Sequence, residues 1–69
     1  MSYITVEEIM SRYHLKKSTF YNRRRECLLN PKFKDAILLD GRQTLIEEDL
    51  WDKFMRDRSE RQRKRLLNL

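Results

Sequence analysis

The chain has 69 residues, of which 39% are hydrophobic and 39% are charged, and it carries a formal net charge of +5 at pH 7. This length allows one small domain with one modest core, and a single Cys excludes a disulfide framework. The sequence has no apolar run of the roughly 20 residues that span a bilayer, and its first residues lack the pattern of a signal peptide, so we expect a cytoplasmic protein without membrane contact.

The first helix is predicted to begin at about Val6. The run from Thr5 to Glu8 matches a capping box, in which a Thr hydroxyl and a Glu carboxylate satisfy free amides at a helix start. An apolar stripe at helical spacing then follows, formed by Val6, Ile9, Met10 and Tyr13.

His14 lies in the very short connection before the next helical pattern, and two helices joined this tightly indicate a helix-turn-helix. The turn position of such a motif needs a positive φ, which usually calls for Gly. His is one of the few other residues enriched in that conformation, so we expect His14 to occupy the turn. With no second His or Cys at ligand spacing, the sequence predicts no metal site.

The second helix is predicted within the basic stretch LKKSTFYNRRREC, from Leu15 to Cys27. Phe20 and Cys27 share the face that we expect to enter the core. The opposite side combines positive charge, amide, hydroxyl and an aromatic ring, which are the groups that bind phosphates and read base edges. These residues are Ser18, Tyr21, Asn22 and Arg25, with Lys17 at the helix start.

Asn30-Pro31 is expected to end this helix, because the residue before proline is pushed out of the helical region. Phe33 follows between Lys32 and Lys34. We expect the ring to enter the core with the lysines solvated; the alternative is contact of this segment with phosphates.

Asp40-Gly41 separates two short strand-prone runs and predicts a β-hairpin with a two-residue turn. Arg42 then projects from the tip. Two strands are not stable alone in water, so this hairpin must pack against the helices.

A third helix is predicted to open at the acidic run from Glu47 to Asp49, which suits the positive end of the helix dipole. Its apolar stripe consists of Leu50, Trp51, Phe54 and Met55. Residues 58–69 are basic and form either a projecting helix or a solvated, frayed end. Their leucines, Leu66, Leu67 and Leu69, offer a contact with a neighbouring molecule.

Two helices, a hairpin and a third helix in this order resemble a winged helix-turn-helix. From Ile4 to Met55 the chain is similar to the excisionase-like branch found in phages and integrative elements, which is related to the DNA-binding domain of mercury-resistance-type regulators. The resemblance rests on the opening Thr-x-Glu-Glu helix, the Lys-x-Ser-Thr-x-Tyr start of the basic helix, the Asp-Gly wing and the closing amphipathic helix. Arg23 is a departure, because the family commonly has an aliphatic residue three positions after Phe20.

The resemblance implies a mostly α fold with a small β-hairpin, in which residues 1–57 form the winged helix-turn-helix and residues 58–69 a basic tail. It also implies a recognition helix in the major groove and a wing on the adjacent minor groove or backbone. Asn22 is then a candidate for adenine and Arg25 for guanine, while Arg42 is the wing contact. The full set of expected DNA-binding residues is Lys16, Lys17, Ser18, Thr19, Tyr21, Asn22, Arg23, Arg24, Arg25, Arg42 and Gln43.

The function expected on these grounds is sequence-specific binding of double-stranded DNA by a mobile-element protein, either an excisionase that directs recombination or a small transcription regulator. Self-association in an array or dimer, and contact with an integrase, belong to the same expectation. The alternative is a phage-type interaction module whose basic face binds an acidic protein. One His, one Cys and one Gly provide no catalytic constellation, so we expect neither an enzyme nor a cofactor.

Overall fold

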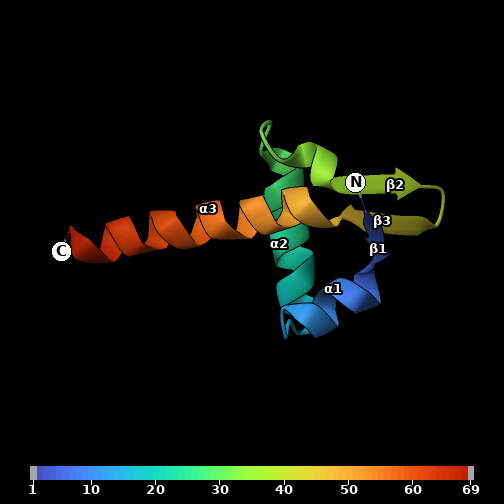
Figure 1. Cartoon of the computed structure of the whole chain (residues 1–69), viewed down its shortest axis with the longest axis horizontal. Helices are drawn as coiled ribbons and strands as arrows, with labels where there is room; N and C mark the ends of the chain where they lie inside the picture. Colours follow the sequence, from blue (N-terminus) through green and yellow to red (C-terminus); the bar gives the residue numbers. More distant parts are fainter. Residues whose placement is uncertain (1, 69) are drawn as a thin grey trace.

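The computed structural model describes residues 2–68, and these are mostly helical, as the sequence predicts. In chain order they form β1 (Tyr3–Thr5), α1 (Val6–Arg12), α2 (Lys17–Leu29), a short 3-10 helix (Lys34–Ala36), β2 (Ile37–Asp40), β3 (Gln43–Glu47) and α3 (Glu48–Leu67). Figure 1 shows α2 crossing α3, which continues well beyond the rest of the molecule. The principal extents are 43 × 24 × 19 Å, and α3 is the reason for the longest of them.

The capping box and the turn after α1 are confirmed. The Thr5 hydroxyl accepts a hydrogen bond from the Glu8 amide at 3.2 Å, and the Glu8 carboxylate accepts one from the Thr5 amide at 3.4 Å. At the other end His14 adopts a φ of +53°. The Leu15 amide donates to the Met10 carbonyl and the His14 amide to the Ser11 carbonyl, which together form a Schellman motif.

α2 ends where Pro31 predicts it to end, with Asn30 in an extended conformation. Phe20 and Cys27 are fully buried, as expected, and the Cys27 thiol donates to the Phe33 carbonyl at 3.1 Å. Phe33 itself is buried, so the expectation that it enters the core is confirmed.

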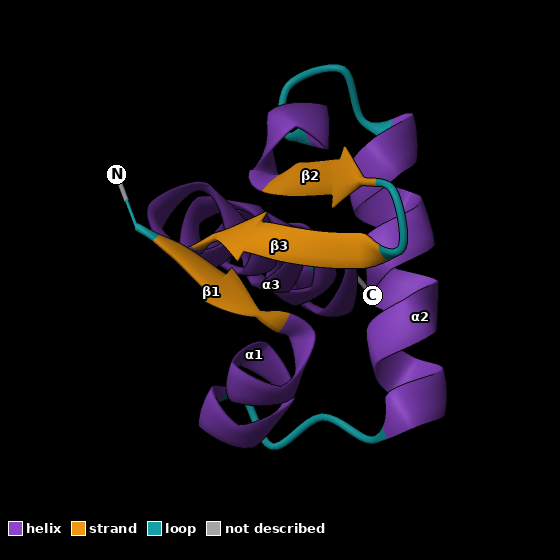
Figure 2. Ribbon diagram, turned by 90° about the vertical axis from the view of Figure 1, so that its right-hand side faces the viewer, coloured by secondary structure: helices purple, strands orange, loops and turns teal. Residues whose placement is uncertain are grey.

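The sheet has one strand more than the sequence predicts. β1 pairs with β3, and the strand order is β1-β3-β2 with all pairings antiparallel. In Figure 2 the sheet lies in front of α3, with α2 along one side. The expected β-hairpin of β2 and β3 is present, but its turn is shifted: Asp40 pairs with Gln43, so the two turn residues are Gly41 and Arg42. Gly41 has a φ of +58° at the first turn position, the pattern of a type II′ turn.

The shift places Ile37 opposite Ile46, and both side chains are buried. A turn at Asp40-Gly41 would instead place Ile37 opposite Thr44. Because a shift of register changes which side chains meet over the core, burial of the isoleucine pair selects the observed turn.

α3 begins at Glu48, and Glu47 caps it by accepting a hydrogen bond from the Leu50 amide at 2.7 Å. Trp51 and Phe54 are fully buried, while Leu50 and Met55 are half-buried at the edge of the core. Of the two alternatives for residues 58–69, a projecting helix is observed through Leu67; Leu69 lies outside the described residues.

The core is built on an aromatic cluster. The Trp51 ring centroid lies 5.7 Å from that of Phe20 and 5.4 Å from that of Phe54. Phe54 also contacts Phe33, with centroids 5.8 Å apart. These contacts hold α2, α3 and the segment after α2 together. The buried apolar residues are Ile4, Ile9, Phe20, Cys27, Phe33, Ala36, Ile37, Ile46, Trp51 and Phe54.

Candidate nucleic-acid interface

The side of α2 that faces away from the core carries the residues expected there. Helical periodicity separates them from Phe20 and Cys27, and every one of them is exposed. We refer to this surface as the α2 outer face: Lys17, Ser18, Tyr21, Asn22 and Arg25.

The other predicted residues of α2 lie at the borders of this face. Lys16 precedes the helix and is exposed, whereas Thr19, Arg23 and Arg24 are half-buried. The guanidinium carbon of Arg24 lies 5.8 Å from the centroid of the Tyr21 ring, within the range of a cation–π contact. This contact places a positive charge beside the exposed aromatic ring.

Two leucines in the last turn of α2, which are not among the expected DNA-binding residues, also belong to this surface. Leu29 is 76% exposed, and Leu28 is half-buried beside it. Leu29 lies nine positions after Phe20, which is half a turn away from the core side of a helix, so periodicity could have identified it. A shallow groove of about 460 Å³ results, lined by Tyr21, Asn22, Arg24, Arg25, Leu28 and Leu29.

The chemistry of this groove is mixed. The Asn22 amide and the Arg25 guanidinium offer donors of hydrogen bonds beside the aliphatic Leu29. Base edges in the major groove of DNA present the matching groups, namely acceptors of hydrogen bonds and the apolar methyl group of thymine.

Arg42 and Gln43 are exposed, as predicted, and belong to the β2–β3 hairpin, whereas the other predicted residues belong to α2 or directly precede it. Within residues 2–68 no hydrogen bond or ion pair joins the hairpin turn to α2. Figure 1 shows the turn at the end of the long axis opposite to the projecting part of α3, with α2 crossing between them. In Figure 2, viewed from the side of the hairpin turn, the turn overlaps α2 in projection.

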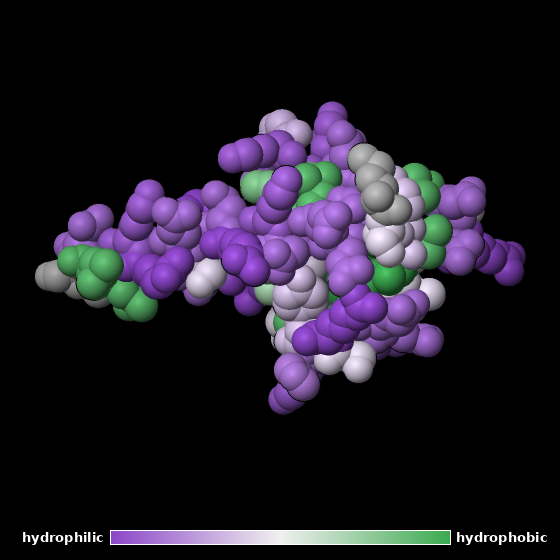
Figure 3. All heavy atoms as spheres, in the orientation of Figure 1, coloured by the Kyte–Doolittle hydropathy of each residue, from purple (hydrophilic) through white to green (hydrophobic). Residues whose placement is uncertain are grey.

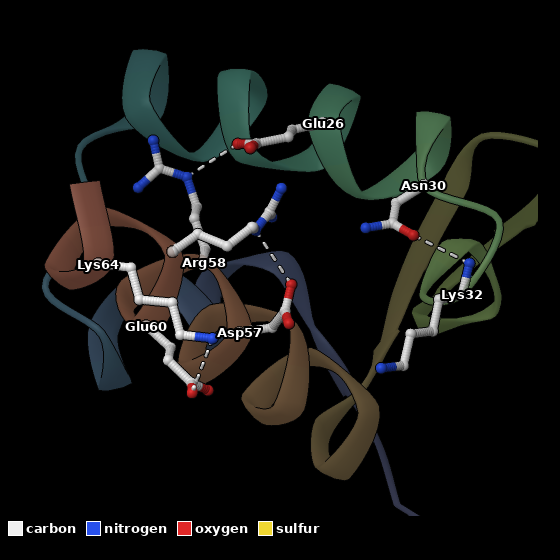
Figure 4. A network of polar contacts seen from close by, with 8 residues as sticks. Glu26, Asn30, Lys32, Asp57, Arg58, Glu60 and Lys64 are labelled. Carbon is white, nitrogen blue, oxygen red and sulfur yellow. Dashed lines mark hydrogen bonds and ion pairs between the residues drawn. The ribbon is translucent and has the colours of Figure 1, made fainter. Parts of the chain in front are cut away.

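A contact between α2 and α3 was not predicted. Arg58 donates from Nε to a Glu26 carboxylate oxygen at 2.9 Å, and this ion pair is partly shielded, with side-chain exposures of 22% and 39% (Figure 4). The two residues are 32 positions apart, and no local pattern in the sequence connects them. The sequence predicts that Arg58 belongs to the basic tail, whereas the structure shows its side chain paired with α2.

Two side chains have shifted pKa values, and both belong to the core side of the molecule. Burial raises the pKa of the Cys27 thiol to about 11, with a smaller contribution from the charge of Glu26. Burial also raises the pKa of Tyr13 to about 12, assisted by a hydrogen bond from its hydroxyl to Asp52 at 3.0 Å. Neither group belongs to the α2 outer face.

Comparisons of the chain with protein families, with curated proteins and with solved structures found no match. Across residues 2–68, no helix is both long enough and apolar enough to cross a membrane. In the same part of the chain no cluster of His, Cys, Asp and Glu is suited to hold a metal ion.

Proposed function

We propose that this protein binds double-stranded DNA sequence-specifically as a winged helix-turn-helix, with α2 in the major groove. The observation that supports this most directly is the α2 outer face, on which cations, an amide, a hydroxyl and an aromatic ring are all exposed on one side of a single helix. A major groove about 12 Å wide admits one α-helix.

Under this proposal the residues of the face have separate roles. Asn22 pairs with adenine and Arg25 with guanine, and each bidentate pair contributes roughly 1–3 kcal/mol of discrimination. Lys16, Lys17 and the half-buried Arg23 and Arg24 bind phosphates, which sets the register of the helix on the duplex.

The hairpin acts as the wing. Arg42 occupies the second turn position and is exposed, so it can reach a minor groove or phosphate beside the bound helix, with Gln43 next to it. Wing contacts of this kind position the domain more than they specify sequence.

The biological role that we propose is that of a mobile-element protein, an excisionase or a small transcription regulator. The two roles differ in how DNA is occupied: an excisionase binds several adjacent sites and bends them, whereas a regulator acts as a dimer on paired half-sites. Stoichiometry and bending of the complex distinguish them.

The test begins with selection of binding sites from a random pool of duplexes of about 20 base pairs, roughly two helical turns. Binding of the selected duplex and of a scrambled duplex is then measured by fluorescence anisotropy. We expect a clear preference for the selected sequence, and we expect Asn22→Ala and Arg25→Ala each to reduce that preference by about 5-fold to 150-fold, the equivalent of 1–3 kcal/mol.

Arg42→Ala serves as a comparison, because it is expected to weaken binding to both duplexes without changing the preference. A wild-type protein that selects no sequence, and whose binding vanishes between about 50 and 200 mM salt, would contradict the proposal. In that case the basic surface becomes a candidate for an acidic protein partner.

A further inference from the structure

The net charge of the chain is concentrated in its last segment. Residues 58–69 contain five cations and one acid, so they carry four of the five net positive charges, while the first 57 residues are nearly neutral overall. Figure 3 shows this part of α3 as an almost uniformly hydrophilic rod that ends in a small apolar cluster. A strongly positive helix that projects from a nearly neutral domain is suited to attract a negatively charged partner.

The cations are arranged on a defined face of α3. Trp51 and Phe54 face the core, and the same side of the helix continues at a spacing of three to four residues as Arg58, Arg61 and Arg65. Gln62 lies between them. The side that packs on the domain in the first half of α3 therefore becomes an arginine stripe in the second half.

This stripe and α2 enclose a groove of about 180 Å³, lined by Glu26, Arg58, Arg61, Gln62 and Arg65. Three guanidinium groups thus share the groove with one carboxylate. Arg58 pairs with Glu26 at 2.9 Å (Figure 4). Arg61 pairs with Asp57 on its own helix at 3.2 Å. Within the described residues Arg65 pairs with no acid, so the groove retains an excess of positive charge.

We propose that this arginine groove is a second nucleic-acid site, which binds backbone phosphates next to the duplex segment contacted by α2. The inference rests on the proposed function. Guanidinium groups bind phosphate oxygens with two parallel hydrogen bonds, and four of the five cations in this segment are arginines. The groove has the size and charge for phosphate groups and offers little apolar surface to a protein partner.

The position of the groove fits this assignment. Glu26 lies about a quarter turn from the α2 outer face, so the groove opens along one flank of α2. A helix in the major groove has a sugar–phosphate backbone on each flank. The hairpin turn and the projecting part of α3 extend to opposite sides of α2 in Figure 1, one for each backbone.

The same residues argue against a coiled coil at this place. From Arg56 to Arg65 the chain has ten consecutive residues without an apolar side chain, so α3 lacks the heptad seam on which a partner helix packs. This polar stretch of helix, about 15 Å long, is instead suited to contact with solvent or with a polyanion.

The experiment compares two matched double variants. Arg61→Gln with Arg65→Gln removes two cations from the groove and one ion pair, that with Asp57. Arg63→Gln with Lys64→Gln removes two cations from other faces of α3 and also one ion pair, that with Glu60 at 3.7 Å. Circular dichroism verifies that both variants retain the helix content of the wild type.

The measured quantity is the slope of log K against log salt for a scrambled duplex, which counts phosphate contacts. We expect the groove variant to lower the magnitude of the slope by about 1.8, corresponding to roughly 0.9 for each lost phosphate contact, and the control variant to stay close to the wild type. Equal losses in both variants, or a loss only in the control, would overturn the assignment of the groove.

The proposed function and this inference fail in different ways. Preference for a selected sequence with an unchanged slope in both variants refutes only the groove, whereas a slope change confined to the groove variant without any preference refutes only sequence-specific recognition. Absence of DNA binding by the wild type refutes both. Vesicles with anionic headgroups are measured in parallel, and loss of vesicle binding by the groove variant without a change in the DNA slope would assign the groove to lipid phosphates and overturn the proposal.

Discussion

His14 is the residue at which the backbone of the turn between α1 and α2 departs from ordinary geometry. Its φ of +53° belongs to the left-handed region, which costs a residue with a Cβ roughly 1–2 kcal/mol relative to the right-handed helix. The side chain is exposed and makes no hydrogen bond within the described residues. The position therefore requires the left-handed backbone conformation and does not depend on a contact of the imidazole.

We therefore expect His14→Gly to stabilise the protein. The relief of strain is partly offset by the greater flexibility of the unfolded chain, which leaves a gain of about 0.5–1 kcal/mol in the free energy of unfolding. Urea denaturation followed by Trp51 fluorescence measures it, since the single Trp is fully buried in the core. His14→Val is the control and should lower the free energy of unfolding, because a β-branched residue is strained at a positive φ. A glycine variant that is less stable than the wild type would contradict the argument.

At the scale of single elements, the hairpin turn depends on Gly41. Its φ is +58°, and a Cβ added there would meet no atom within 4 Å, so a larger side chain suffers from backbone strain alone. Gly41→Ala should lower the free energy of unfolding by about 1 kcal/mol. Gly41→Asn should cost less, because Asn tolerates this region, and equal losses for the two variants in a urea titration would argue against the strain.

The projecting half of α3 contributes little to the domain that it leaves. Within residues 2–68, all ten buried apolar residues precede residue 55, and beyond Arg58 the helix is supported by exposed ion pairs between residues four positions apart. Pairs of this kind contribute about 0.3–0.5 kcal/mol each, and the basic last turn suits the helix dipole.

Truncation after Arg58 should accordingly leave the free energy of unfolding within about 0.5 kcal/mol of the full chain, the range of surface changes. Arg58 is retained because it pairs with Glu26. Urea unfolding of the truncated and the full chain measures this difference. A decrease of several kcal/mol in the free energy of unfolding on truncation would show that residues 59–69 pack on the domain. The same shortened chain should show a smaller dependence of DNA affinity on salt, because it has lost Arg61 and Arg65 of the arginine groove, while the phosphate contacts proposed for α2 and the hairpin remain.

At the scale of the whole molecule, the features that the sequence predicts correctly are those decided over one helical turn. The capping box at Thr5, the left-handed turn at His14, the helix stop before Pro31 and the burial of Trp51 and Phe54 each follow from residues within about four positions of one another. The α2 outer face was predictable for the same reason.

The features that were missed depend on partners far away along the chain. β1 has three residues and exists because Ile4 pairs with Ile46, and the hairpin turn is placed by the burial of Ile37 against Ile46. The Arg58–Glu26 ion pair, and with it the arginine groove, requires the crossing of α2 and α3. Local patterns carry no information on such pairings, because the geometry of the complete fold decides them.

The stability of the whole molecule should fall at alkaline pH for a reason located in its core. Burial raises the pKa of Cys27 from 9.0 to about 11, and that of Tyr13 from 10.0 to about 12. Between about pH 9 and 12 the unfolded chain has released protons that the folded chain still holds, so fewer protons are bound in the unfolded state and the free energy of unfolding decreases as pH rises.

The contribution of Cys27 is on the order of 2 kcal/mol, fully present below pH 9 and lost as the pH approaches 11. Cys27→Ser removes this titration while keeping a donor for the Phe33 carbonyl, so its unfolding free energy should change less between pH 9 and 11 than that of the wild type. Tyr13→Phe removes the second component and should flatten the curve mainly between pH 10 and 12. Urea titrations at intervals over this range provide the curves, and identical slopes in wild type and Cys27→Ser would mean that the thiol is not held protonated by the core.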